Sequence, residues 1–243
     1  MKKIRTLTYF TSTLILLLFC VTANAQEQNI ASEKQVDTLV IKQKYGLRLG
    51  TDISKLVRSF LDDEYKGFEI NGDYRLTTNW YVAGELGTEE KTTSNDFISS
   101  TANGSYFKAG FDYNMYTNWL GMENMIYSGF RVGASTFSQQ RNSYTVYSTD
   151  QFWSPQFTSS DTEKFSGLSS IWAELIMGFK AEVLSNLFVG VQAQLKYSIS
   201  EDDPENFGNH FIPGFGKTYD GSKIGVGYGY TVSYLIPIFK KNK

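Results

Sequence analysis

Residues 224–234 have the sequence IGVGYGYTVSY, in which every second residue is apolar or aromatic. Successive side chains of a β-strand point to opposite faces, so one face of this segment is apolar and the other carries glycine, threonine and serine. The same alternation recurs in seven further segments, which begin near residues 45, 68, 80, 107, 126, 171 and 187. Aromatic residues make up 16% of the chain and there are 21 glycines, a composition that suits strands and turns. We therefore predict eight β-strands.

The lengths of the predicted connections give a second signal. Short connections are expected at 77–79, 116–124 and 184–186, and long ones at 54–66, 88–104, 138–168 and 200–223. Short and long connections thus alternate, as they do in outer-membrane barrels with short periplasmic turns and long external loops. Backbone groups in lipid are all paired only if the sheet closes, so the last strand should pair with the first. The sequence predicts an all-β fold, an eight-stranded antiparallel up-and-down transmembrane β-barrel.

The N-terminal segment has the features of a secretory signal peptide. Lys2, Lys3 and Arg5 precede an apolar stretch, and the small residues of 23–25 form a cleavage site. We predict a signal peptide over 1–25, a flexible periplasmic lead-in over 26–43, and an outer-membrane β-barrel over 44–243. An even number of strands places both termini in the periplasm. The one cysteine, Cys20, lies within the predicted signal peptide, so the mature chain should have no disulfide.

The charge of the mature chain excludes one class of partner. Loss of three basic residues with the signal peptide changes the formal net charge from −2 to −5. An acidic chain without a basic stripe is poorly suited to nucleic acid, and no nucleic-acid partner is expected. After residue 25 no apolar run approaches the length of a spanning helix. The expected partner is outer-membrane lipid, with glycan or protein contact through the loops as a further possibility.

The predicted strands carry charged residues in mid-strand on the face opposite the apolar one. A charge facing lipid near the bilayer midplane costs ~2–4 kcal/mol, so this face should line the interior. The predicted interior charges are Arg48, Asp52, Glu69, Asp73, Arg75, Glu85, Lys108, Asp112, Arg131, Glu174, Lys180, Glu182 and Lys196. An eight-stranded interior is only wide enough for its own side chains, and the two signs nearly match. We favour an interior filled by ion pairs over a proton or ion path.

Three glycines and a set of aromatic residues complete the predicted architecture. Gly225, Gly227 and Gly229 share the inward face of the last strand, where they should leave space for Arg48 and Lys196 to cross the interior. Aromatic residues near the predicted periplasmic strand ends should form an interfacial girdle. The predicted girdle residues are Tyr45, Trp80, Tyr116, Trp119 and Phe239.

Four short stretches resemble an uncharacterised outer-membrane β-barrel family of Bacteroidota, a domain of unknown function. They are YGLRLG at 45–50, FLDDEYKG at 60–67, DYNMY at 112–116 and YLIP at 234–237. The resemblance covers nearly the whole mature chain. It implies the fold and the outer-membrane location, and it implies no activity.

Few residues suggest chemistry. His210 is the only histidine and lies in a predicted loop without a distinguishable serine partner, so we expect it to be structural. The acidic stretch 201–205 lacks the spacing and glycine of a calcium loop. We predict no catalytic residues, no metal and no cofactor. In the loop 138–168, Tyr144, Tyr147, Phe152, Trp153 and Phe157 are interleaved with hydroxyl residues, a composition that fits glycan or protein contact or simple strand extension equally well.

These observations favour a non-enzymatic barrel with a plugged polar lumen, which acts in a structural or surface-recognition role through its external loops. One alternative is a lipid-modifying enzyme acting at the barrel rim. A second alternative is a narrow pore or small-solute transporter. A third is a soluble lipocalin-like carrier, which shares the strand count but has its charges on the outside.

Overall fold

A computed structural model describes residues 42–116, 123–146, 157–204, 208–219 and 221–242, all within a compact unit that spans Val40–Lys243. The predicted signal peptide and nearly all of the lead-in lie outside the described residues, as does Trp119 of the predicted girdle. Residues 42 and 43, assigned to the lead-in from the sequence, already belong to the first strand.

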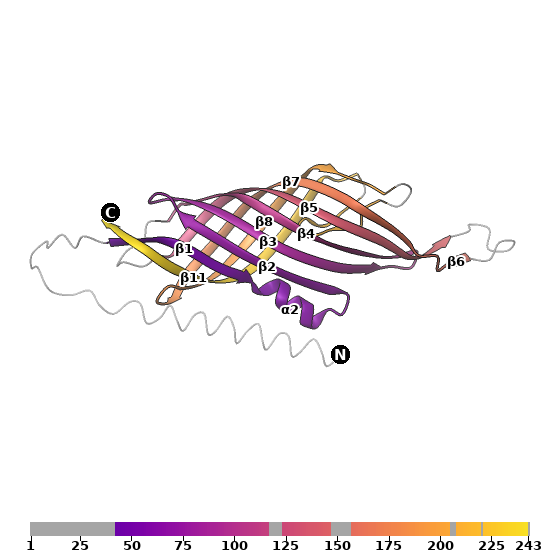
Figure 1. Cartoon of the computed structure of the whole chain (residues 1–243), viewed down its shortest axis with the longest axis horizontal. Coiled ribbons are helices and arrows are strands. Elements are labelled where there is room, and N and C mark those ends of the chain that lie inside the picture. Colours follow the sequence, from indigo (N-terminus) through magenta and orange to yellow (C-terminus); the bar gives the residue numbers. More distant parts are fainter. Residues whose placement is uncertain (1–41, 117–122, 147–156, 205–207, 220, 243) are drawn as a thin grey trace, which may run out of the picture. The chain divides into compact units, whose positions relative to one another are not determined.

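Eight long strands form an antiparallel ring (Figure 1). They are β1 (Lys42–Asp52), β2 (Tyr65–Arg75), β3 (Trp80–Ser94), β4 (Ile98–Asn114), β5 (Met125–Val146), β7 (Glu163–Leu184), β8 (Leu187–Glu201) and β11 (Ile224–Asn242). Each strand pairs with the next in this order, and β11 pairs with β1 from Asn242 opposite Lys42 to Thr231 opposite Asp52. The predicted pairing of the last strand with the first is confirmed. We call the end of the ring near residues 42 and 242 the terminal end, and the opposite end the helix end.

Several strands are longer than predicted, and the expected loop at 88–104 is wrong. Strand β3 continues to Ser94 and β4 starts at Ile98, so only 95–97 connect them. Strands β5 and β7 likewise extend to Val146 and from Glu163 into the region 138–168. These extensions are rich in polar residues, which weakens the apolar alternation by which the strands were found, while their backbone pairing continues. The connections therefore do not alternate strictly between short and long.

A helix, α2 (Ile53–Leu61), replaces the loop predicted at 54–66 and follows β1 directly. The Asp52 carboxylate accepts a hydrogen bond from the Ser54 backbone N–H at 2.8 Å, which satisfies a free donor of the first turn. Apolar residues recur at helical spacing, at Ile53, Leu56 and Phe60. In the part of the chain that the structure describes, no helix is long and apolar enough to cross a membrane.

Three short strands lie outside the ring. Strand β6 (Phe157–Ser159) pairs with the end of β5. Strands β9 (Phe211–Ile212) and β10 (Gly216–Lys217) pair with each other in the connection between β8 and β11. The segment 211–217, which we call the inward turn, is apolar and largely buried except for the exposed Lys217, although the sequence predicts that it belongs to a long loop over 200–223.

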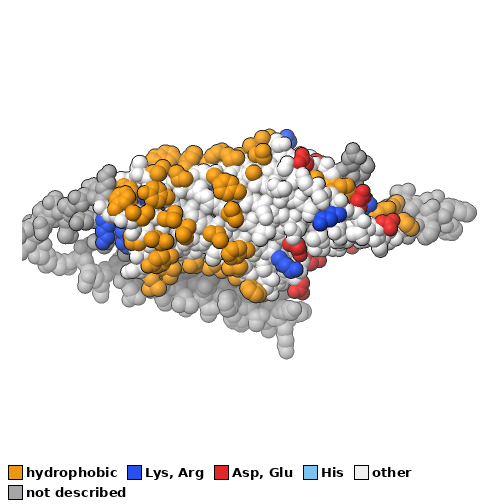
Figure 2. All heavy atoms as spheres, in the orientation of Figure 1, with side chains coloured by type: hydrophobic (Ala, Val, Ile, Leu, Met, Phe, Trp, Pro, Cys, Tyr) orange, Lys and Arg blue, Asp and Glu red, His pale blue; other side chains and the backbone are white. Residues whose placement is uncertain are grey.

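The two faces of the ring differ sharply in chemistry. The interior holds buried Arg, Lys, Asp and Glu side chains, whereas the outward positions of the same strands are exposed and apolar. Figure 2 shows hydrophobic side chains spread over the visible strands, with charged side chains gathered toward the ends. We call these outward residues the apolar belt, which includes Leu47, Leu49, Phe68, Ile70, Val82, Leu86, Phe107, Phe111, Val132, Leu175, Met177, Val191, Leu195, Val226, Tyr228 and Tyr230.

Candidate functional site

Ion pairs link the predicted interior charges into a chain along the inside of the ring. Toward the terminal end, Asp73 lies 3.0 Å from Arg48 Nε and 2.7 Å from Lys180 Nζ. Lys180 lies 3.9 Å from Asp112, and Arg131 Nη2 lies 2.7 Å from the other oxygen of Asp112. The two contacts of Lys180, from β7 to β2 and β4, cross the interior, whereas the pairs of Arg48 with Asp73 and of Arg131 with Asp112 join neighbouring strands.

The chain of ion pairs continues toward the helix end through Lys108. Its ammonium lies 2.9 Å from Glu85, 3.4 Å from Glu174 and 3.9 Å from Glu69. Lys196 contacts Glu174 at 3.6 Å. A fully buried lysine among three carboxylates is compensated in charge, which is the condition for burying ionised groups at all.

The structure also shows where the other predicted interior residues lie. Lys180 and Glu182 are half-buried and the rest of the predicted set is buried. Asp52 forms no ion pair among the described residues, because it caps α2 instead. Arg75 and Glu182 lie at the terminal end, where they pair with Glu123 at 2.8 Å and with Lys44 at 3.1 Å.

Sequence reasoning missed four participants in these pairs: Lys44, Lys55, Glu89 and Glu123. Lys44 and Glu123 flank the predicted strands, where alternation gives no signal. Lys55 reaches inward from α2 to Glu89 at 2.5 Å and to Glu69 at 3.3 Å. Its helical position could have been inferred only from the helical spacing of the apolar residues around it.

Lys55 and Glu89 lie at the helix-end edge of the apolar belt, because the outward residues on either side of Glu89 on β3, Thr88 and Glu90, are polar. Burial lowers the pKa of Lys55, but the carboxylates of Glu89 and Glu69 outweigh it and raise the pKa. For Glu89, burial acts to raise the pKa. The Lys55 ammonium and the Gly214 N–H outweigh the effect of burial and lower the pKa of Glu89 to about 2. Both groups are therefore charged at neutral pH and hold α2 against the ring.

The glycines of β11 leave space for different side chains than predicted. Gly227 faces Gln194 and Lys196, so it leaves space for Lys196 as predicted. Gly225 lies against the Phe215 ring and Gly229 against the Asp52 carboxylate. The prediction for Arg48 is wrong, since its guanidinium contacts Asp73 and lies 4.5 Å from the centre of the Phe188 ring.

The predicted aromatic girdle is wrong at Tyr45. The register between β1 and β11 shifts at a bulge between Tyr45 and Gly46, which reverses the alternation and turns Tyr45 inward. Only 6% of Tyr45 is exposed, and Arg75 lies 5.1 Å from the centre of its ring. Trp80, Tyr116 and Phe239 are exposed.

The inward turn closes much of the helix end from within. The Phe215 N–H donates to the Ile212 carbonyl at 3.1 Å, and Gly214 has a φ of +82°, a left-handed conformation that favours glycine. Lys196 Nζ donates to the carbonyls of Gly214 and Phe215 at 2.7 and 3.0 Å. The apolar residues of the turn pack in a buried cluster formed by Tyr106, Phe137, Trp172, Ile212 and Phe215.

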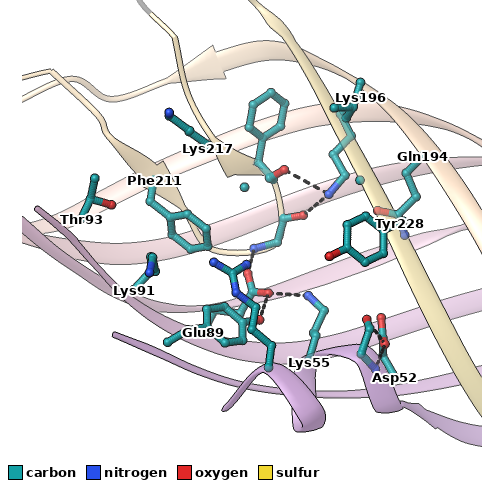
Figure 3. A pocket seen from close by; sticks show the side chains of 18 of the residues that line it. Asp52, Lys55, Glu89, Lys91, Thr93, Gln194, Lys196, Phe211, Lys217 and Tyr228 are labelled. Atoms are coloured by element: carbon teal, nitrogen blue, oxygen red, sulfur yellow. Dashed lines mark hydrogen bonds and ion pairs between the residues drawn. The ribbon is translucent and has the colours of Figure 1, made fainter. Parts of the chain in front are cut away.

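Two cavities differ in size and place. A cavity of about 20 Å³ lies in the middle of the ring among Asp73, Glu85 and Arg131, which is room for about one water molecule. A cavity of about 420 Å³ lies at the helix end between α2, the inward turn, β8 and β11 (Figure 3). The larger cavity is within the size range of small-ligand pockets.

His210 and the possible metal ligands are the remaining candidates for chemistry. Gln139 Nε2 lies 3.2 Å from His210 Nδ1, so the histidine is held at the inner side of the inward turn. No group of three or more His, Cys, Asp or Glu residues that could hold a metal occurs among the described residues.

The arrangement defines an all-β protein in which an eight-stranded antiparallel ring has ion pairs inside and apolar side chains outside. The chain belongs to a family described as a domain of unknown function (DUF6048), whose model matches residues 6–241. A similar solved structure is that of Ail, the attachment invasion locus protein of Yersinia pestis, with 10% sequence identity and a TM-score of 0.39. That likeness covers 80% of this chain and 98% of Ail. No curated protein matches the sequence.

Proposed function

We propose that this protein is an integral outer-membrane β-barrel with a filled polar interior and both termini in the periplasm. The apolar belt carries the proposal. Exposed residues such as Leu195 and Val226 alternate along their strands with the interior-facing residues Lys196 and Gly227. Large exposed apolar surfaces are rare on soluble proteins, and burying them in lipid is favourable.

The inside–outside arrangement also argues against a soluble carrier of the lipocalin type. Such a carrier would face water with its charged residues and enclose an apolar cavity. Here the ionisable residues, such as Lys108 and Asp112, are inside, and the outward positions beside them, Phe107 and Phe111, are apolar.

The exposed residues of helix α2 also support a membrane environment. Val57, Phe60 and Leu61 are exposed on it, while Lys55 points into the ring. A helix that turns its apolar face outward fits a membrane interface rather than water.

The packed interior supports a closed barrel rather than a pore. Lys108 reaches Glu174 at 3.4 Å and Lys180 reaches Asp73 at 2.7 Å across the ring, and the cavity beside Arg131 holds about one water molecule. A protein with such a filled barrel has a structural role, or a role in surface recognition through the connections at the helix end. Phe157 is exposed at that end, and Tyr144 lies beside Arg141, a combination suited to contact with a glycan or a protein.

Gel mobility and conductance test this proposal. The purified protein should require detergent and should migrate differently on a gel before and after boiling, because the folded barrel resists dodecyl sulfate. Planar bilayer recordings should show no stable current steps. A chain that stays monomeric and soluble without detergent contradicts membrane insertion, and steady reproducible openings contradict the filled interior.

A further inference from the structure

The wall of the ring is incomplete at the helix end between β2 and β11. Strand β1 ends at Asp52, opposite Thr231 of β11. On the other side, the pairing of β1 with β2 ends at Thr51 opposite Ile70. Residues 224–230 of β11 and 65–69 of β2 therefore have no strand partner toward each other among the described residues. We call this opening the wall gap.

Helix α2 spans the wall gap, and the cavity of about 420 Å³ lies behind it. The cavity is lined on the gap side by Asp52, Lys55, Val226 and Tyr228, so it reaches both the interior and the outer face of the ring. Figure 3 shows Lys55 entering from α2, with Lys196 and Tyr228 on the opposite side.

The inner lining of this cavity is predominantly basic. It contains Lys55, Arg58, Lys91, Lys196, Lys217 and His210, and its only carboxylates are Asp52 and Glu89. Asp52 is engaged with the first turn of α2, and Glu89 with Lys55 and the Gly214 N–H. Lys217 is exposed and has no carboxylate within salt-bridge distance among the described residues. Carboxylates just outside the lining also pair with Arg58, Lys91, Lys55 and Lys196. Among the described residues, Lys217 is therefore the one lysine or arginine of this lining without an ion-pair partner.

The mouth of this cavity is apolar. Val226 and Tyr228 are 79% and 71% exposed, and both belong to the apolar belt. Phe68 of β2 is exposed on the other side of the gap. A ligand at the gap therefore meets lysine inside and an apolar surface outside, and the apolar surface is continuous with the one that we assign to lipid.

We propose that the cavity binds the anionic headgroup, a carboxylate or a phosphate, of a single-chain acyl amphiphile whose chain leaves through the wall gap. The headgroup lies among Lys55, Lys196 and Lys217, and the chain lies along Val226 and Tyr228. The cavity volume suits one headgroup with the first part of its chain. This inference rests on the membrane insertion proposed above, because the chain needs an apolar surrounding outside the gap.

Photolabelling in dodecyl maltoside micelles tests the inference. The probe is palmitic acid with a diazirine in its chain, and mass spectrometry locates the labelled residues. Labels should concentrate on β11 near 226–228 and on α2. Unlabelled palmitate and dodecyl phosphate should compete, whereas inorganic phosphate, acetate and dodecanol should not, because each lacks either the chain or the charge.

Charge reversal supplies the matched comparison. Lys217→Glu should lower labelling at the gap about tenfold, since it replaces a charge-assisted contact by repulsion. Lys164→Glu changes an exposed lysine on β7, away from the cavity, and should leave labelling unchanged. Both substitutions are at exposed positions, and gel mobility before and after boiling shows that each variant is folded.

Each outcome decides one question. Labels spread over the apolar belt, equal effects of the two lysine substitutions, or competition by dodecanol overturn the binding site while leaving membrane insertion intact. Competition by inorganic phosphate alone points to a soluble anion and also overturns the inference. A protein that needs no detergent and shows no shift on boiling refutes the proposed function itself.

Discussion

The interior of the ring is filled in different ways in its middle and at its helix end. In the middle, β1 pairs with both neighbours, and the interior is filled by side chains of the ring strands, such as Asp73, Lys108 and Arg131. At the helix end, α2 replaces β1, and the interior is filled by the inward turn with Phe215 and Ile212.

The difference lies in what each filling requires. Ion pairs in the middle are buried and mutually compensating, so loss of one partner leaves another charge without compensation. At the helix end the filling comes from a returning segment and a helix, which can move without breaking the ring. The middle should therefore be rigid and sensitive to substitution, and the helix end adaptable, as a binding region requires.

The largest effect is expected from removal of a carboxylate in the middle. Asp73→Leu leaves the buried Arg48 without its ion-pair partner and Lys180 with only Asp112 at 3.9 Å, and it should lower the free energy of unfolding by ~3–5 kcal/mol. Denaturant unfolding of the protein in liposomes measures this change. Asp62→Ala, which alters a partly exposed carboxylate outside the ring, should cost less than ~1 kcal/mol. Equal losses would contradict the distinction between the two regions.

A glycine comparison separates two parts of the helix end, the packed cluster around Trp172 and the larger cavity. A Cβ at Gly133 would lie 2.3 Å from the Trp172 ring, which is fully buried and donates to Glu174 at 2.7 Å. Gly133→Ala should therefore destabilise by ~1–3 kcal/mol through overpacking. Gly227→Ala contacts only the ends of Gln194 and Lys196 beside the larger cavity, and should cost clearly less.

A second control for overpacking lies on the outer face. Val226→Leu should be nearly silent in the same unfolding experiment, because leucine is as apolar as valine and faces outward. If Val226→Leu were the most damaging of the three substitutions, the inside–outside assignment would be inverted.

The N-cap of α2 gives an intermediate effect that is confined to the helix end. Asp52→Ala removes the acceptor for the Ser54 N–H and should weaken α2 by ~0.5–2 kcal/mol, while the ring remains folded. Hydrogen exchange of the amides in 53–61 should accelerate, with little change in β4 and β5. Asp52→Asn should restore most of the protection, because asparagine is also a good N-cap.

The last expected effect is a pH dependence of the docking of α2. The pKa of Glu89 is about 2 in the folded protein and has an ordinary value of 4.5. A carboxyl group with a lowered pKa stabilises the fold above its unfolded pKa and loses this contribution as the pH falls through the folded value. Docking should be constant above about pH 4.5 and weaken between about pH 4.5 and 2.

Pepsin, which is active in this pH range, can report the docking through cleavage near Phe60. Protection of the wild type should fall toward that of Glu89→Gln as the pH approaches 2, when the two are compared at each pH. A wild type and variant that differ equally at pH 4 and pH 2 would contradict the contribution of the Glu89 carboxylate.

The sequence was sufficient for the parts of the fold that depend on two-residue alternation. The inward set from Arg48 to Lys196 and the outward set from Leu47 to Tyr230 follow from the pleat alone. Alternation fails where a bulge intervenes, so Tyr45 was assigned to the wrong face. It also fails in the strand extensions, such as β3 beyond Thr88, where polar residues predominate.

The helix end was mispredicted for two further reasons. Ile53 continues the two-residue pattern of β1 as well as the helical pattern of α2, so the change of period is hidden at that residue. The inward turn is short, and only its tertiary contacts with Trp172 and Lys196 distinguish it from an exposed loop. The larger cavity lies between α2 and the inward turn, so it could not be predicted from the sequence.

The seam between β1 and β11 also bears on the order in which the fold forms. Lys42 pairs with Asn242 across almost the entire described chain, whereas the other ring neighbours follow each other along the sequence. Contacts between distant segments pay the greatest loop-closure entropy and slow the folding of a chain. The hairpins from β2 to β8 should therefore assemble first and the seam last, with α2 docking into the opening that this final step leaves.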